Sequence, residues 1–229
     1  MSAAEALAPE QSVDEVRESL SVTEKGQPAN TIGNCRTVFC HDPLLRGAIR
    51  LNLLTDRVDI VRDLGWRRNT SALTDTDVKY LLLYFEQTYG LTSEKKMTAA
   101  LSIVANENCY HPIQDALNGL VWDGTPRIRS CLHHFLGADE SDYVEEMLKH
   151  FLLGAIRRVF RPGSKYEEML CLVGGQGAGK SSFFRLLAIR DEWFSDDLKK
   201  LDDDRVFLKL QGHWIIEMSE MLATSSAKS

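Results

Sequence analysis

Residues 174–181 have the sequence Gly-Gly-Gln-Gly-Ala-Gly-Lys-Ser, and they constrain the fold more than any other part of the chain. They fit the pattern G-x-x-x-x-G-K-[ST], a loop that wraps the phosphates of ATP or GTP. The glycines allow a tight turn, so that successive backbone N–H groups point inward at anionic oxygens. Such a loop joins a strand to a helix, and its flanks therefore test the assignment.

The flanks have the composition that a strand and a helix require. Residues 169–173 form a short apolar run, typical of a buried parallel strand. Residues 182–189 combine helix-forming and apolar residues. We therefore expect an α/β fold with a P-loop nucleoside-triphosphatase core. The alternative is a glycine-rich surface turn between two core elements.

The loop residues predict the ligands of a nucleotide and its metal ion. The expected binding residues are Gly174, Gly175, Gln176, Gly177, Ala178, Gly179, Lys180, Ser181 and Ser182. Lys180 supplies a positive charge for the β- and γ-phosphates, and the Ser181 hydroxyl is placed to ligate Mg²⁺. ATP and Mg²⁺ are the expected cofactors.

A second part of the site is expected downstream. Residues 213–217 resemble a buried strand that ends in the carboxylate of Glu217, which could bind Mg²⁺ directly or through water. Glu220 follows three residues later and could orient or deprotonate the attacking water. We predict Lys180, Glu217 and Glu220 as the catalytic residues. Acidic residues that simply face solvent are the alternative.

Composition limits the class of protein. The chain has 229 residues, of which 44% are hydrophobic and 26% are charged, as in soluble globular proteins. Its net charge of −6 excludes a surface coated in positive charge but leaves room for a local basic channel. No apolar run approaches the roughly 20 residues of a membrane helix. Five cysteines without a C-x-x-C pair fit reduced thiols, so we expect a cytoplasmic protein.

We expect three regions along the chain. Residues 1–30 are interpreted as a disordered or linker segment with one short acidic helix, which a capping box begins at residues 12–15. Residues 31–139 form a small α+β and mainly helical region, with a β-hairpin near residues 49–60. Residues 140–229 form the P-loop ATPase domain, and it begins with a strongly amphipathic helix over residues 142–160.

Two groups of basic residues have alternative interpretations. The first is Arg157, Arg158, Arg161 and Lys165, and the second is Arg62, Arg67 and Arg68 around Trp66. Cations at the end of the helix over residues 142–160 suit its dipole, but they could also contact a DNA or nucleotide phosphate. The second group could contact single-stranded nucleic acid through charge and stacking.

An ordered series of motifs resembles a known family. The series is His-Pro at 111–112, Trp-Asp-Gly-Thr-Pro-Arg at 122–127, Phe-Leu-Gly-Ala at 135–138, Arg-Val-Phe-Arg-Pro-Gly at 158–163, the loop at 174–182, Trp-Phe-Ser-Asp at 193–196 and Gly-His-Trp-Ile-Ile-Glu-Met-Ser-Glu at 212–220. From about Gly26 onward the chain resembles the virulence-associated protein E family of phages, prophages and genomic islands. Members of that family are similar to superfamily 3 helicases and poxvirus-type primase-helicases.

The resemblance implies a function and partners. Lys180 and Ser181 would be the phosphate and Mg²⁺ residues, and Glu217 the acidic residue of the second nucleotide motif. The implied activity is that of a DNA-dependent ATPase or helicase in the replication of a mobile element. The implied partners are DNA, single-stranded or at a fork, and further copies of the chain, as in a hexameric ring.

The resemblance also implies further strands, a sensor residue, an arginine finger and a DNA-contacting hairpin after the second motif. Little chain follows Glu217, so we expect an incomplete P-loop core and the front part of a longer protein, active only in its full-length form. Two other functions remain open. One is a non-catalytic nucleotide-binding module that titrates a partner, and the other is a small-molecule kinase.

Overall fold

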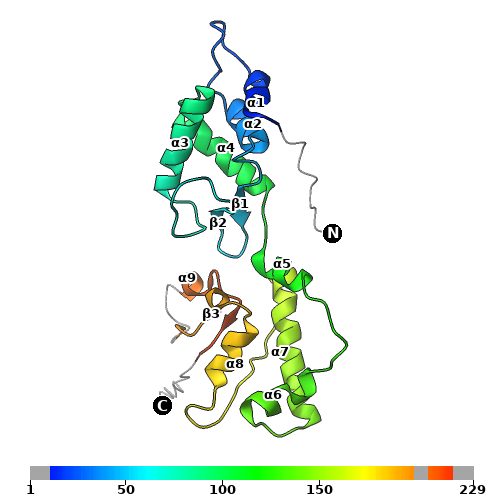
Figure 1. Ribbon diagram of the computed structural model, residues 1–229. Coiled ribbons are helices and arrows are strands. Elements are labelled where there is room, and N and C mark those ends of the chain that lie inside the picture. Colours follow the sequence, from blue (N-terminus) through cyan, green and yellow to red (C-terminus); the bar gives the residue numbers. More distant parts are fainter. Residues whose placement is uncertain (1–10, 199–205, 219–229) are drawn as a thin grey trace. The chain divides into compact units, whose positions relative to one another are not determined.

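The computed structural model describes residues 11–198 and 206–218, and the chain divides into two compact units (Figure 1). The first unit comprises the described residues up to His111, and the second comprises those from Pro112 onward. This division falls earlier than the boundary that we expected after residue 139. Each unit has its own hydrophobic core.

Among its described residues the first unit contains four helices and two strands, of which the sequence predicts the short first helix and the hairpin. Its elements are α1 Val13–Ser19, α2 Ile32–His41, β1 Ile49–Asn52, β2 Arg57–Ile60, α3 Asp75–Tyr89 and α4 Glu94–Glu107. β1 and β2 form the expected antiparallel hairpin, in which Ile49 lies opposite Ile60. α3 ends at Gly90, whose φ of 67° is left-handed and suits glycine.

Helix α1 belongs to the core of the first unit. The Ser12 side chain accepts a hydrogen bond from the Glu15 N–H, and the Glu15 carboxylate accepts one from the Ser12 N–H, which confirms the capping box. Val16 and Leu20 are buried in the core. The described residues 11–30 therefore fold onto this unit, while the disorder expected for residues 1–10 lies outside the described residues.

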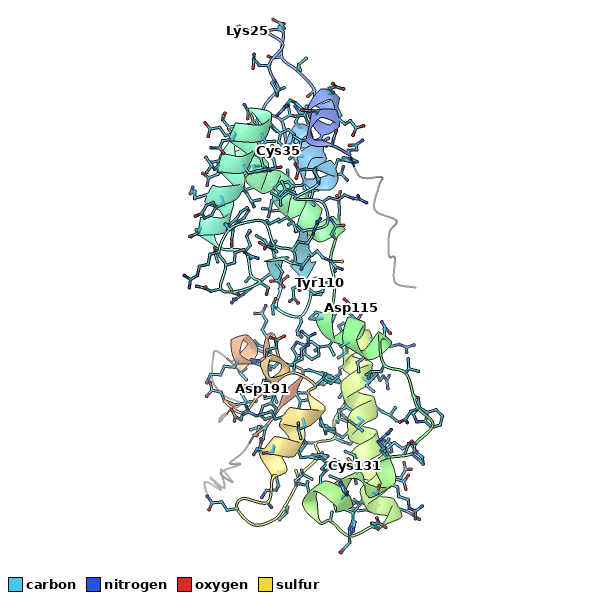
Figure 2. The ribbon with its side chains drawn as sticks, in the orientation of Figure 1. Lys25, Cys35, Tyr110, Asp115, Cys131 and Asp191 are labelled. Carbon is cyan, nitrogen blue, oxygen red and sulfur yellow. The ribbon has the colours of Figure 1, made fainter. Side chains whose placement is uncertain are left out.

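A buried carboxylate in the first unit has hydrogen-bond donors beside it. The Asp42 carboxylate is fully buried and accepts hydrogen bonds from the hydroxyls of Tyr84 (2.7 Å) and Tyr89 (2.6 Å). Cys35 on α2 lies among the helices (Figure 2), and burial raises the pKa of its thiol. This thiol therefore stays protonated and is a packing residue.

The second unit is built around one long helix. Its elements are α5 Pro112–Asn118, α6 Ile128–Leu136, α7 Asp142–Phe160, α8 Lys180–Leu187, the 3₁₀ turn η1 Asp191–Trp193, β3 Phe194–Ser195, α9 Val206–Leu210 and β4 Ile215–Ile216. The bounds of α7 are those predicted from its amphipathic pattern. Leu148 of α7 packs with Leu132 of α6 and Phe183 of α8 in the core of this unit. None of the described helices is both long and apolar enough to cross a membrane.

Helix α6 was not predicted. Its first turn follows Arg127, and no side chain caps that end by a hydrogen bond. The start of a helix is hard to recognise in a sequence that has no capping signal, so this segment lacked the local evidence that identified α1. Gly137, with a φ of 68°, ends the helix next to the phosphate loop.

The second unit contains one parallel strand pair among its described residues. β3 and β4 pair with Phe194 opposite Ile215 and Ser195 opposite Ile216. The strand predicted over residues 213–217 is therefore confirmed, although the strand itself is only two residues long. The Glu217 N–H extends the pairing by donating to the Ser195 carbonyl at 2.8 Å.

The strand predicted over residues 169–173 was wrong. Leu170 and Leu172 pack against the core, whereas Met169, Cys171 and Val173 are exposed, so burial alternates as it does along a strand. Within the described ranges, however, the backbone groups of residues 167–173 form no hydrogen bond, because β4 pairs with β3 instead. We call residues 167–173 the extended segment. The P-loop core as a whole remains a prediction.

Candidate nucleotide-binding site

The glycine loop turns sharply between the extended segment and α8. Gly177 and Gly179 have φ angles of 79° and 82°, which only glycine adopts without strain. Gly179 is the N-cap of α8, and the helix begins at Lys180. Free N–H groups and the positive end of the helix dipole therefore face the loop, as in anion sites at helix N-termini.

The loop is open to solvent, and its lysine folds back onto it. Residues 173–179, Ser181 and Ser182 are exposed. The Lys180 ammonium donates to the carbonyl oxygens of Gly174 (2.9 Å) and Gly175 (2.8 Å). An anion in the loop could replace these two neutral acceptors, because a hydrogen bond between two charged groups is the stronger one.

The two predicted metal ligands meet. The Ser181 hydroxyl donates to the Glu217 carboxylate at 2.7 Å, although the residues are 36 positions apart in the sequence. The second oxygen of the same carboxylate, Oε2, is buried and has no hydrogen-bond partner within the described residues. A buried carboxylate oxygen without a donor, next to a hydroxyl, fits the hard oxygen ligands that Mg²⁺ prefers.

The protein supplies few ligands for a metal ion here. In the part of the chain that the structure describes, no group of three or more His, Cys, Asp or Glu side chains gathers. Mg²⁺ commonly keeps several waters and binds substrate phosphates together with one or two carboxylates. Ser181 and Glu217 fit this mode of binding. The third predicted catalytic residue, Glu220, lies outside the described residues, and its role stays a prediction.

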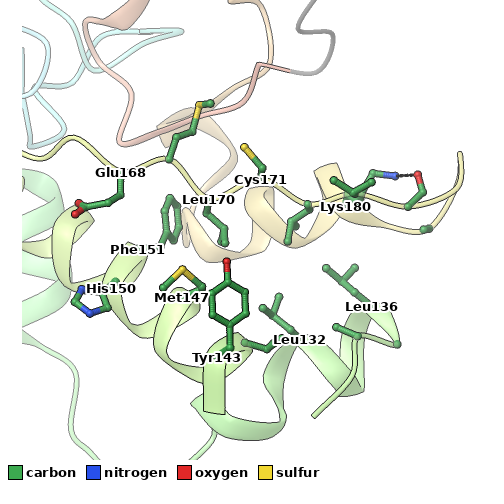
Figure 3. Close-up of a pocket in the computed structure, with 18 of the residues that line it drawn as sticks. Leu132, Leu136, Tyr143, Met147, His150, Phe151, Glu168, Leu170, Cys171 and Lys180 are labelled. Carbon is green, nitrogen blue, oxygen red and sulfur yellow. Dashed lines mark hydrogen bonds between the residues drawn. The ribbon is translucent and has the colours of Figure 1, made fainter. Parts of the chain in front are cut away.

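Two cavities flank the extended segment. The first, of about 560 Å³, lies between the segment, α6 and α7 (Figure 3). The second, of about 500 Å³, lies between the segment and β4 and is lined by Trp214 and Glu217. Lys180 lines both cavities.

Sequence reasoning missed the first cavity. Its wall includes Tyr143 and Met147, which lie four residues apart and therefore on one face of α7. Both are exposed to some degree, so they do not belong to the buried stripe of the helix that its periodicity reveals. The sequence signal that could have revealed the cavity is this second apolar face of α7, beside its buried stripe.

In the basic group around Trp66, some of the side chains form contacts within the protein. The Arg68 guanidinium forms a 2.9 Å ion pair with Asp77, and the Trp66 indole N–H donates to the same carboxylate at 2.8 Å. Both partners of the ion pair are largely buried. The buried Asp77 carboxylate thus engages both Arg68 and Trp66, and contact of this group with single-stranded nucleic acid stays an untested alternative. Arg67 is exposed.

The other basic group lies where a helix dipole favours it. Arg157 and Arg158 occupy the last turn of α7, and Arg161 is its C-cap. The negative end of the dipole is stabilised by cations at these positions. This placement fits the plainer of the two interpretations of the group.

The candidate site lies within a stretch of the chain that matches a known domain family. Residues 117–229 match the virulence-associated protein E-like domain, and this stretch contains the glycine loop, Lys180, Ser181 and Glu217. A search of curated proteins found no significant match to the chain. The match begins further along the chain than Gly26, where the resemblance of the motifs begins. Residues 117–229 therefore carry a virulence-associated protein E-like domain.

Proposed function

We propose that the chain binds Mg-ATP at residues 174–182 and belongs to a DNA-dependent ATPase of the helicase type, which acts in the replication of a phage or another mobile element. One contact carries this proposal. The hydrogen bond from Ser181 to Glu217 joins the start of α8 to the end of β4 beside an open glycine loop. Two oxygen ligands and an anion-binding turn thus lie at one place.

Each residue has a distinct part in the proposed site. The loop N–H groups and the N-terminus of α8 bind phosphate oxygens. The Lys180 ammonium exchanges the Gly174 and Gly175 carbonyls for the β- and γ-phosphates. Ser181 and Glu217 hold Mg²⁺, which when bound neutralises charge on the phosphates. Glu220 is proposed to orient the attacking water.

The fold class belongs to the same proposal. An α/β P-loop core accounts for a phosphate loop that begins a helix and for a parallel strand pair whose second strand ends at Glu217. The likeness to helicases comes from the motif series that the chain shares with its family.

Oligomerisation would complete the site. Among the described residues, no arginine side chain hydrogen-bonds or pairs with Ser181 or Glu217. An arginine finger accelerates phosphoryl transfer by roughly 10³–10⁵ and can come from a neighbouring molecule. We therefore propose a homo-oligomer, such as a ring, that works on DNA in the bacterial cytoplasm.

The test measures binding and turnover separately. Calorimetry with Mg-ATP is expected to show binding by the wild-type chain and none by Lys180→Ala. Lys149→Ala, which removes an exposed lysine of α7, serves as the control and is expected to bind normally. Equal affinity of the Lys180→Ala variant would refute the site.

Hydrolysis then distinguishes the functions. ATP turnover that rises with single-stranded DNA would support the helicase-type ATPase. Because activity is expected only of the full-length form, turnover is measured on that form, and ATP binding without turnover there would instead assign a non-catalytic nucleotide-binding module. Phosphate transfer to a small acceptor would assign a kinase.

A further inference from the structure

The first cavity opens directly onto the phosphate loop. Gly174, Ala178 and Lys180 form its end at the loop, and Gly137 and Ala138 at the end of α6 lie on its rim. Its volume of about 560 Å³ lies within the roughly 300–1,000 Å³ typical of small-ligand sites. A ligand held by the loop could therefore extend into this cavity without leaving the protein surface.

The walls combine flat apolar surface with free backbone groups. Tyr143, Met147 and Phe151 rise from α7 toward the extended segment that carries Leu170 and Cys171 (Figure 3). Aromatic and thioether side chains stack on planar rings. The opposite wall is the extended segment, whose N–H and C=O groups form no hydrogen bond within the described residues.

A heterocyclic base matches both kinds of wall. It has two apolar faces for stacking and an edge on which hydrogen-bond donors and acceptors alternate. An extended backbone presents N–H and C=O groups in the same alternation, and these groups are obligatory hydrogen-bond partners. A purine therefore fits the space between α7 and the extended segment better than a purely apolar ligand does.

The position of the metal ligands selects this cavity over the second one. Glu217 lines the second cavity and not the first, so the metal and the terminal phosphate lie on the side of β4. Ala178 lines the first cavity and not the second. A nucleotide whose terminal phosphate faces Glu217 has its nucleoside on the opposite side of Lys180.

We infer that the cavity between α6, α7 and the extended segment holds the purine base of the nucleotide, stacked against Tyr143 and Met147. This inference rests on the proposed function, because it requires phosphates in the glycine loop. It adds the origin of selectivity for a nucleoside, which the phosphate loop alone does not provide. Tyr143 is 72% exposed, so its ring is free to close over the base.

The test compares Mg-ATP with magnesium tripolyphosphate, which has the phosphates but no nucleoside. The variants are Tyr143→Ala with Met147→Ala, Lys180→Ala, and Leu153→Ala as the control. Leu153 is also an exposed apolar residue of α7, at 56%, but it does not line this cavity. Affinity for both probes is measured by calorimetry, and folding by thermal unfolding.

The expected result is a loss of ATP affinity alone. Stacking is worth about 1–3 kcal/mol per base, so the double variant should bind Mg-ATP at least about fivefold more weakly. Its affinity for tripolyphosphate should stay within about twofold, and Leu153→Ala should resemble the wild type. Lys180→Ala should weaken both probes, which tests the phosphate site independently.

Two outcomes would overturn the inference. One is an unchanged ratio of ATP to tripolyphosphate affinity in the double variant while Lys180→Ala still loses both probes. The other comes from photolysis of bound 8-azido-ATP, which should label peptides from residues 142–151 or from the extended segment. Labelling confined to other peptides would place the base elsewhere. If Lys180→Ala bound both probes normally, the proposed function itself would fail.

Discussion

The Ser181 hydroxyl donates its hydrogen to Glu217 at 2.7 Å, and this leaves the oxygen lone pairs of Ser181 free for a cation. Ser181 is fixed by the first turn of α8, and Glu217 is fixed by the hydrogen bond of its N–H to Ser195. The two side chains are thus held by separate elements that meet at the loop. Their geometry does not depend on a ligand to bring them together.

Glu217→Gln is expected to weaken Mg²⁺ dependence strongly. The substitution keeps the size of the side chain but removes the charge that Mg²⁺ requires. Changes around a metal site cost about 10–100-fold in affinity, so the half-saturating Mg²⁺ concentration for ATP binding should rise at least about tenfold. A titration of Mg²⁺ at constant ATP measures this, with Glu192→Gln at an exposed carboxylate as the control. An unchanged Mg²⁺ titration in the Glu217→Gln variant would contradict the assignment.

Glu220→Gln should affect a different step. If Glu220 orients the attacking water, its substitution slows hydrolysis and leaves the Mg²⁺ titration nearly unchanged. The measurement is the same Mg²⁺ titration together with the rate of phosphate release. A larger shift in Mg²⁺ dependence for Glu220→Gln than for Glu217→Gln would exchange the roles of the two carboxylates.

Local signals predicted much of the fold. The capping box at Ser12 and Glu15 placed α1, and the amphipathic pattern placed both ends of α7. Helix α6 has no capping side chain and was missed. The extended segment was mistaken for a paired strand because its apolar run is a local feature, whereas pairing depends on which strand lies beside it. The composition of a segment does not reveal which strand will lie beside it.

The sequence likewise predicted one part of the candidate site and missed another. The motif spacing predicted that Ser181 and Glu217 would lie together, because the chemistry of Mg²⁺ requires both. The base cavity depends on how α7 packs against the extended segment, and no motif describes that packing. Arg67 and Arg68 are adjacent in the sequence yet differ in exposure, because only Arg68 reaches the buried carboxylate of Asp77.

Arg68→Ala and Arg67→Ala are therefore expected to differ. Arg68→Ala leaves Asp77 buried without its charged partner, which typically costs about 3–5 kcal/mol of unfolding free energy. Arg67→Ala changes an exposed side chain and should stay within about 0.5 kcal/mol of the wild type. Urea unfolding of both variants measures the difference. Equal stability of the two variants would mean that the ion pair contributes nothing to the fold.

The same carboxylate predicts a pH dependence. Burial alone would raise the pKa of Asp77, but hydrogen bonds from Trp66, Thr74 and Arg68 outweigh it, so the pKa lies below its ordinary value. In the unfolded chain the pKa of an aspartate is about 3.9. The stabilisation by Asp77 is therefore fully present above that pH and is lost as the pH falls through the lowered pKa of the folded state.

Asp77→Asn removes this titration. We expect the variant to be less stable than the wild type at pH 7, and the difference should shrink below about pH 4 as the wild-type carboxylate becomes protonated. Urea unfolding at pH 7 and at pH 3 measures the two differences. A stability difference that is the same at both pH values would show that the charge of Asp77 does not stabilise the folded state.

Gly154 in the interior of α7 permits a close contact with Tyr166. A Cβ atom at Gly154 would lie 2.4–2.7 Å from three carbons of the Tyr166 ring. Replacement of glycine by alanine inside a helix ordinarily stabilises it by about 1 kcal/mol. At this position the ring must move, and overpacking typically costs about 1–3 kcal/mol. Gly154→Ala is therefore expected to lower the stability of the protein.

A double-mutant cycle separates the contact from helix propensity. In a Tyr166→Ala background the obstructing ring is gone, so Gly154→Ala should stabilise the protein there and destabilise it in the wild type. Thermal unfolding of the four proteins measures this change of sign. Since Tyr166 lines both cavities beside the extended segment, the Gly154→Ala variant should also bind ATP more weakly. Destabilisation of the same size in both backgrounds would show that the ring does not set the requirement for glycine.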